Sequence, residues 1–491
     1  MKIFLYSTHL FYSPHIETEL ELMQKHLNQG DEVFRVICAG ELSICDMNQR
    51  HELLTCMRCR DIRNFGKKLL DGTVINLPII TQVSGKQVFQ PVKCRTVEDL
   101  KNIYYKNFDI GYAIASSLIS ICRESDINIE MHADTVDAYY SSSLKVYLST
   151  IEYIEKYKPD VVYIFNSRIA HVRAVMRACE DQKIDFVVHE RGCDKDRYEL
   201  FYNTMPHSIK YQLSKIEEYW NKSEHLVEEK KQMATRFYSD RKNGNPGDWS
   251  SFTKEQTADL LPAGFDRTKK NIVIYNSSMY EYLAVSKEWN YPFYNNQEEF
   301  IANLLKMFEG DSNYHFYLRV HPNLKDSVSS QINRISALNF HNLSLISADS
   351  KVSSYHLLDN CDQIITFGST MGIEATFWNK PSILVASSVY GDEAVYKASN
   401  YDEVYSVIKS NPLPKNKESA YKYGYYNMVF GMSYFHFKPE TLFRGTYKGF
   451  DLMEAKSFLT KFVTRIYQTR FIGKPIDIYA RLYKKYKLKL N

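Results

Sequence analysis

Residues 362–381 place hydroxyl side chains and a carboxylate directly after an apolar strand. The letters "DQIITFGST" predict a strand that ends at Gly368, Ser369 and Thr370, and "MGIEATFWN" predicts the helix that follows. Ligands of open α/β sheets bind beyond the carboxyl ends of the strands, and a helix N-terminus suits a phosphate. Glu374, one turn further, is placed to accept hydrogen bonds from a ribose. The alternative is that Ser369 caps the helix and Glu374 is a first-turn acid.

A second polar group follows the predicted strand in "YLRVHPN". Arg319 and His321 share one face of this strand, and Pro322 forces an extended or turning backbone after it. A histidine at this position can donate to the phosphate of a leaving group or act as a general acid. The alternative is a buried histidine that is satisfied by the backbone. Ser353 and Ser354 open a predicted helix beside the same site, where they could contact a base.

A third group lies in the N-terminal half, at the end of the strand in "VVHERG". Glu190 ends this strand, with Arg191 and Gly192 just beyond it, and Asn166 and Arg168 follow the preceding strand. A carboxylate at a strand tip that faces a cleft can serve as the general base toward an acceptor hydroxyl. The other four residues are expected to contact the acceptor. The alternative for Glu190 is a surface ion pair with an arginine, which contributes little.

His15 lies where the first predicted strand leads into its helix, next to Ser13. We assign His15 to the acceptor site as well. The alternative is that this turn only caps the helix through Ser13.

Four cysteines fall within residues 38–59, in "CAGELSICDMNQRHELLTCMRC". Cys38, Cys45, Cys56 and Cys59 could supply four thiolates, and the last pair has the Cys-x-x-Cys spacing of a zinc knuckle. Such a site would be structural, because four cysteines leave no open coordination position. The alternative is that Cys38 belongs to the core and the others are free thiols.

The elements that must position these groups alternate between short apolar strands and amphipathic helices. This alternation occurs over residues 2–38, 144–192 and 270–387, with a polar, turn-rich stretch near 240–265. Because single cores rarely exceed about 250–300 residues, the 491-residue chain needs more than one domain. We expect an α/β fold of two facing Rossmann-like domains with a cleft between them, over residues 1–250 and 265–430. Residues 431–491 are expected to form a basic, helical tail.

Charge is concentrated at the C-terminal end. Residues 461–491 hold nine Lys or Arg and one acid, so the rest of the chain carries a net charge of −4 out of the total of +4. Tyr, Leu and Ile alternate with these cations, which suits an anionic membrane surface; the alternative is a solvated helix end. No nucleic-acid motif accompanies them, so we expect no nucleic-acid partner. No apolar run reaches the roughly 20 residues of a membrane span, and we expect a cytoplasmic protein, peripheral on the inner face of the plasma membrane.

The order of these motifs resembles that of bacterial sialyltransferases and capsule Kdo-transferases. The matching elements are Glu190-x-Gly192, His321-Pro322 and Ser369-Thr370, and residues 356–383 are similar to capsule polysaccharide biosynthesis proteins generally. The resemblance covers about 160–390, and implies the GT-B fold, a CMP-activated donor and Glu190 as the base. It also implies that His321, Ser369 and Thr370 hold the CMP phosphate.

These inferences together predict a metal-independent glycosyltransferase that uses a nucleotide-sugar donor and needs no catalytic cofactor. Its partners would be that donor and an oligosaccharide or lipid-linked glycan acceptor. Three alternatives stay open. CDP-glycerol-type glycerophosphotransferases and UDP-sugar 2-epimerases resemble the same pattern, and a non-catalytic scaffold of a capsule assembly complex would keep the fold without the reaction.

Overall fold

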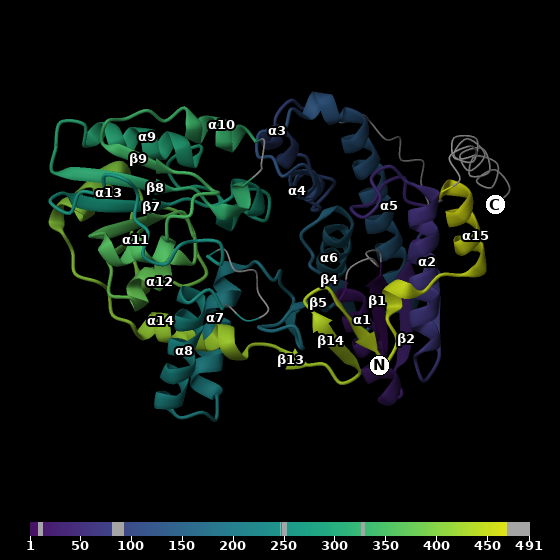
Figure 1. Ribbon diagram of the computed structural model, residues 1–491. Helices are drawn as coiled ribbons and strands as arrows, with labels where there is room; N and C mark the ends of the chain where they lie inside the picture. The colour runs from purple at the N-terminus through teal and green to yellow at the C-terminus, as the bar shows by residue number, and fades with distance from the viewer. Residues whose placement is uncertain (8–12, 81–92, 246, 248–252, 326–328, 469–491) are drawn as a thin grey trace. The chain divides into compact units, whose positions relative to one another are not determined.

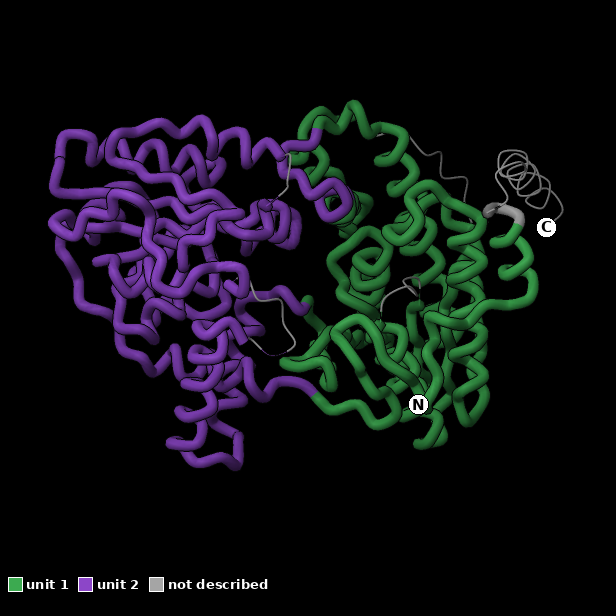
Figure 2. The backbone as a smooth tube through the Cα atoms, viewed as in Figure 1, with its two compact units in different colours: residues 1–117, 128–205, 432–491 green, residues 118–127, 206–431 purple. Residues whose placement is uncertain are grey.

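The chain forms two α/β units in the computed structural model (Figures 1 and 2). The structure describes residues 1–491 except 8–12, 81–92, 246, 248–252, 326–328 and 469–491. The first unit comprises residues 1–117, 128–205 and 432–491, and the second comprises 118–127 and 206–431.

The first unit is built on a seven-stranded sheet in the order β13-β6-β5-β4-β1-β2-β3. The five strands from β5 to β3 are parallel, and β6 and β13 run antiparallel to their neighbours. The strands are β1 (Lys2–Ser7), β2 (Glu32–Ile37), β3 (Val74–Pro78), β4 (Val161–Phe165), β5 (Phe186–Arg191), β6 (Arg197–Tyr202) and β13 (Met432–Ser433). A separate hairpin consists of β14 (Phe437–Thr441) and β15 (Arg444–Tyr447).

Helices cover both faces of this sheet, and its strand residues are therefore buried in nearly continuous runs. One face packs on α1, α2 and the hairpin, with Leu20, Ile62 and Phe437 in one core with Leu5. On the other face, Phe4 and Phe34 contact Tyr157 of α5. The helices are α1 (His15–Asn28), α2 (Leu53–Lys68), α3 (Val97–Lys101), α4 (Ile110–Cys122), α5 (Ala133–Tyr157), α6 (Ala170–Gln182) and α15 (Phe458–Gln468), with 3-10 turns η1 (Ile129–His132) and η6 (Leu452–Glu454).

The second unit is built on a fully parallel six-stranded sheet in the order β12-β11-β10-β7-β8-β9. The strands are β7 (Lys270–Tyr275), β8 (Tyr314–Arg319), β9 (Leu343–Ile346), β10 (Gln363–Thr366), β11 (Ser382–Leu384) and β12 (Tyr396–Lys397). The helices are α7 (Ile209–Lys222), α8 (Val227–Lys242), α9 (Gln297–Met307), α10 (Ser330–Ser336), α11 (Ser354–Asn360), α12 (Met371–Phe377), α13 (Tyr401–Ser410) and α14 (Glu418–Val429). The 3-10 turns are η2 (Met279–Glu281), η3 (Lys287–Trp289), η4 (Pro322–Leu324) and η5 (Asp392–Ala394).

Alternate residues of β7 bury against different helices, as the strand period requires. Ile272 and Ile274 belong to a core with α9, α10 and α13, whereas Val273 and Tyr275 pack with α11 and α12. The second unit is therefore a three-layer α/β/α domain. The expectation of two Rossmann-like domains is confirmed, and the cleft between them stays a prediction.

The unit boundaries differ from the expected ones at residues 118–127, 206–250 and 432–447. Helices α7 and α8 lie in the second unit, since Tyr238 of α8 stacks on Phe377 with ring centroids 4.1 Å apart. Residues 432–447 do not form a separate tail. They return to the first unit, where β13 pairs with β6, and Phe437 and Tyr447 are buried in the core.

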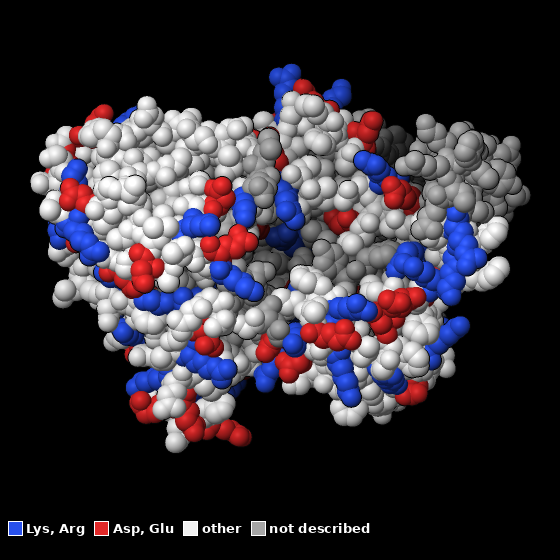
Figure 3. Space-filling view, in the orientation of Figure 1, with Lys and Arg blue, Asp and Glu red and all other residues white. Residues whose placement is uncertain are grey.

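Charged side chains of both signs are interspersed over the face drawn in Figure 3. Among the described helices, none is both long and apolar enough to cross a membrane.

Candidate functional site

The second unit contains a cavity of about 110 Å³ beyond the carboxyl ends of β7, β8 and β10. Half of its lining was predicted from the sequence, namely Arg319, His321, Pro322, Ser354, Ser369, Thr370 and Glu374. The other half was not, and comprises Arg241, Thr253, Gln256, Tyr275, Asn276, Tyr355 and Met371. The structure therefore brings the His-Pro and Ser-Thr motifs together, although 46 positions separate them in the sequence. Ser353 and Gly368 lie outside the lining.

His321 is fixed at the end of β8 by one hydrogen bond from its backbone and one to its ring. Its backbone N–H donates to Asn276 Oδ1 over 2.7 Å, and the backbone N–H of Asn323 donates to His321 Nδ1 over 3.1 Å. Since Nδ1 accepts, the neutral ring carries its proton on Nε2. Burial, with a smaller contribution from Arg319, lowers the pKa of His321 to about 4. At neutral pH the His321 ring is therefore uncharged, and its Nε2–H is a hydrogen-bond donor.

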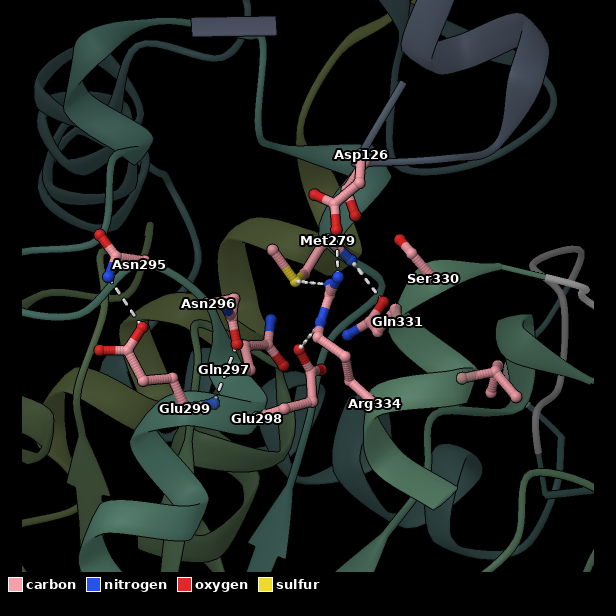
Figure 4. Close-up of polar contacts among 12 residues, drawn as sticks. Asp126, Met279, Asn295, Asn296, Gln297, Glu298, Glu299, Ser330, Gln331 and Arg334 are labelled. Atoms are coloured by element: carbon pink, nitrogen blue, oxygen red, sulfur yellow. Dashed lines mark hydrogen bonds and ion pairs between the residues drawn. The ribbon is translucent and has the colours of Figure 1, made fainter. Parts of the chain in front are cut away.

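The loop that carries Asn276 is held by polar side chains of α9 and α10 (Figure 4). Gln297 Oε1 accepts from the backbone of Ser277 over 3.0 Å, and Gln331 Oε1 accepts from Met279 over 3.1 Å. Glu298 on α9 pairs with Arg334 on α10 over 3.1 Å. These bonds fix the loop, and through Asn276 they fix His321.

Arg319 lines the cavity, but its guanidinium donates hydrogen bonds to the segment between β9 and α11. It donates to the carbonyl oxygens of Ser347 and Ser350 and to Ser354 Oγ, the last over 3.3 Å. The expected contact between Arg319 and the donor therefore competes with these acceptors. Arg319 holds the turn that joins β9 to α11.

The two serines that open α11 have separate roles. Ser353 Oγ caps the helix by accepting from His356 N over 3.0 Å. Ser354 lines the cavity, and its backbone is bound at both ends: its N–H donates to Gln256 Oε1 over 2.7 Å, and its carbonyl accepts from Tyr275 OH over 2.7 Å. The segment around Gln256 thereby forms one wall of the site.

Gly368 turns the chain between β10 and the hydroxyl pair. Its φ is +92°, and a Cβ there would lie 2.5 Å from the carbonyl oxygen of Ser387, so only glycine fits. Ser369 Oγ accepts from Met371 N over 3.3 Å, and Thr370 Oγ1 accepts from a guanidinium nitrogen of Arg241 over 3.1 Å. Both hydroxyl hydrogens are left to donate toward the cavity.

Glu374 is fully buried, and protein donors engage both of its carboxylate oxygens. Oε1 accepts from Arg241 Nε over 3.1 Å, and Oε2 accepts from Tyr355 OH. The expected ribose contact would have to compete with these bonds. Arg241 carries no signal in the sequence, since its helix falls within the range 1–250 expected for the other domain.

The first unit assembles the predicted acceptor residues around the ends of β4 and β5. Asn166 Nδ2 donates to Glu190 Oε1 over 2.5 Å, and the backbone N–H of Arg191 donates to Oε2 over 3.3 Å. Burial raises the pKa of Glu190, and Arg191 and Arg168 oppose that shift. A half-buried carboxylate of raised pKa suits a proton acceptor near neutral pH.

Three further residues predicted for the acceptor site differ in their surroundings and in the exposure of their side chains. His15 is buried, its ring centroid 4.0 Å from that of Phe165. Arg191 donates to the carbonyl of Ser13 over 3.2 Å and lies 4.4 Å from the ring centroid of Phe443, a half-exposed residue of the hairpin turn. The N–H of Gly192 is used within its own turn. Arg191 is therefore better placed than His15 to meet an acceptor.

The four cysteines of residues 38–59 give no coordination geometry. Within the described ranges, no three His, Cys, Asp or Glu side chains come together as a metal site. All four side chains have intermediate exposure, and burial raises the pKa of Cys45 and Cys59 to about 12. The zinc site stays a prediction without support from the geometry.

The strand order and the cavity at the strand ends define a class, the doubly wound α/β proteins that bind ligands beyond their strand ends. Residues 250–410, about a third of the chain, match the family model described as capsule polysaccharide biosynthesis protein. The predicted resemblance to that family is confirmed for this segment, which contains every lining residue of the cavity except Arg241. A comparison with curated protein sequences finds no match.

Solved structures give only distant likenesses. The chain is similar to KpsC, a β-Kdo 2,4 transferase of Thermosulfurimonas dismutans, with 13% identity and a TM-score of 0.35 over 54% of this chain and 79% of that one. It is also similar to a putative UDP-N-acetylglucosamine 2-epimerase of Listeria monocytogenes, with 11% identity and a TM-score of 0.26 over 86% and 90%. At these TM-scores, the likenesses add nothing to the fold that the strand order defines.

Proposed function

We propose that the protein is a glycosyltransferase of capsule or surface polysaccharide biosynthesis that uses a nucleotide-sugar donor. The observation that carries the proposal is the cavity of the second unit, where the His-Pro and Ser-Thr motifs meet inside the segment that matches the capsule family. Its lining offers hydrogen-bond donors from His321, Ser369 and Thr370, which suit a phosphate at the end of a parallel sheet.

The donor we propose is a CMP-activated sugar of the Kdo or sialic-acid type. The order of the three motifs supports this choice. His321 would donate from Nε2 to the phosphate, and the two hydroxyls would bind its other oxygens. These contacts would strengthen as the phosphate leaves and gains charge.

The reaction we propose is displacement at the anomeric carbon. The acceptor hydroxyl oxygen forms the new bond to that carbon, the bond from the carbon to the phosphate oxygen breaks, and CMP leaves with the electron pair. Glu190 takes the acceptor proton. Its raised pKa and its hydrogen bond from Asn166 support this role, because both orient and tune a proton acceptor.

Calorimetric titration of the full-length protein with CMP, CDP, UDP, GDP and CDP-glycerol tests the donor assignment. We expect selective CMP binding that His321→Ala abolishes. A preference for UDP or GDP would overturn the CMP assignment, and a preference for CDP-glycerol would favour glycerophosphate transfer. Absence of any nucleotide binding would contradict the proposal and favour a non-catalytic scaffold.

We further propose that the C-terminal segment contacts an anionic membrane, where a lipid-linked acceptor would lie. Helix α15 supports this, because its small residue Thr460 is buried while Phe458, Leu459 and Phe462 are more than half exposed. Lys461 and Arg465 are exposed on the same helix. Aromatic residues beside cations suit the interface of an anionic bilayer.

A further inference from the structure

Arg241 reaches the donor cavity from a helix that is firmly anchored in the second unit. It lies in the last turn of α8, one turn after Tyr238. The Tyr238 ring stacks on Phe377 of α12, and its hydroxyl donates to the carbonyl of Ala420 on α14 over 2.7 Å. The position of Arg241 is thus set by packing against two other helices.

The guanidinium of Arg241 keeps unused donor capacity. Nε donates to Glu374 Oε1 and one Nη donates to Thr370 Oγ1, each over 3.1 Å. A guanidinium has five N–H groups. The Tyr355 hydroxyl oxygen also accepts a hydrogen bond from this guanidinium, so two of the five N–H groups remain for a ligand. The side chain is 26% exposed where it lines the cavity. Glu374, by contrast, is fully buried and bound on both oxygens.

Arg241 also decides how Thr370 is oriented. Because Thr370 Oγ1 accepts from Arg241, its own hydrogen is available to a ligand. The cavity then presents N–H and O–H donors side by side. Its charged lining residues are Arg241, Arg319 and Glu374, so with a neutral His321 they leave one net positive charge. That charge matches the single negative charge of a phosphodiester, the group that links a nucleoside to a sugar in a CMP-activated donor.

We infer that Arg241 is the cationic ligand of the donor phosphate. Glu374 is then a positioning residue that orients Arg241, and it does not bind the ribose. The identity of the nucleotide in this inference rests on the proposed function. The anion site formed by Arg241 and Thr370 can be tested independently of that function.

The test compares CMP with cytidine, which lacks the phosphate, in Arg241→Lys and Arg241→Gln. Arg241→Lys keeps the positive charge opposite buried Glu374, which protects folding if Arg241→Gln fails to fold. We expect each variant to lose roughly 10- to 100-fold in CMP affinity, because a hydrogen bond to a charged group contributes a free energy of that size. The affinity for cytidine should stay unchanged. Arg236→Gln is the matched control, since Arg236 lies on the same helix, is 74% exposed and pairs with Asp240. We expect it to bind CMP as the wild type does.

Equal weakening of CMP and cytidine would overturn the inference, because it would show that Arg241 only supports the fold. Unchanged CMP affinity in Arg241→Lys and Arg241→Gln would overturn it as well. Inorganic phosphate separates this inference from the proposed function. If phosphate raises the Tm of the wild type but not of Arg241→Lys, while no nucleotide binds, the anion site stands and the proposed function fails. If neither phosphate nor any nucleotide has an effect, both fail.

Discussion

The carboxylate of Glu190 combines partial burial with a hydrogen bond from Asn166, and both bear on its proposed role as base. Burial raises its pKa above the ordinary value of 4.5, so the folded protein holds this proton more tightly than a free carboxyl group does. A base is active only when deprotonated. The raised pKa therefore moves the acidic limb of the pH–rate profile to higher pH.

We expect Glu190→Gln to lower kcat by roughly 10²- to 10⁴-fold, the usual contribution of a general base. Because Glu190 lies in the first unit, donor binding in the second should not change. In the wild type, kcat/KM should fall as the pH drops through a pKa above 4.5, and Asn166→Ala should shift that limb to still higher pH. Transfer assays between pH 4 and 9, with donor affinity measured in parallel, check both. Unchanged turnover in Glu190→Gln would remove Glu190 from the mechanism.

Among the elements, the contact between α8 and α14 connects the stability of the second unit to its site. Gly424 of α14 lies directly against α8, where an added Cβ would come within 2.7 Å of the Tyr238 ring and 3.1 Å of Ala234 Cβ. The two helices approach this closely only because residue 424 has no side chain.

Gly424→Ala should therefore push α14 away from α8 and lower the free energy of unfolding by about 1–3 kcal/mol, as overpacking does. Since α8 carries Arg241, donor affinity should fall too. Gly310→Ala is the control, because a Cβ at Gly310 meets nothing within 4 Å. Urea denaturation and nucleotide titration of both variants provide the measurement. Equal stability of the two variants would show that α14 can adjust without cost.

The sequence predicted those elements whose pattern is local. Apolar strands followed by Gly368 or by His321-Pro322 end where expected, and parallel pairing of β7, β8 and β10 then brings the two motifs together. Arg241 could not be predicted in this way. The position of Arg241 depends on how Tyr238 packs against α12 and α14. The sequence pattern of α8 does not show which helices it packs against.

Unit membership was hidden for the same reason. Helix α8 ends where the polar stretch near 240–265 predicts the domain boundary, and nothing in its letters shows that α14 is its partner. The return of Phe437 to the first core depends on contacts with residues more than 400 positions away, such as Leu20. Periodicity carries no information on such pairs.

For the whole molecule, the exposed side of α15 makes a prediction about membranes. Phe458→Ser combined with Phe462→Ser should reduce co-sedimentation with vesicles that contain phosphatidylglycerol by about 10-fold or more, since each buried phenylalanine contributes about 1.5–3 kcal/mol. Binding should weaken with salt and be small on phosphatidylcholine alone.

Phe435→Ser serves as the control for this experiment, because Phe435 is 84% exposed but lies outside α15. We expect its vesicle binding to equal that of the wild type. Equal binding of the double variant, or no binding by the wild type, would contradict the membrane proposal. Measuring the molar mass in solution separates lipid binding from self-association through the same aromatic face.

The return of residues 432–447 to the first unit also imposes an order on how the chain can mature. A ribosome emits residues in sequence, so the main part of the second unit, 206–431, emerges before the hairpin that covers Leu20 and Ile16. The second unit can close its core while the first still waits for Phe437 and Tyr447. Until translation has passed residue 447, the apolar residues of α1 that Phe437 and Tyr447 bury stay exposed, and exposed apolar surface of this kind is what chaperones bind.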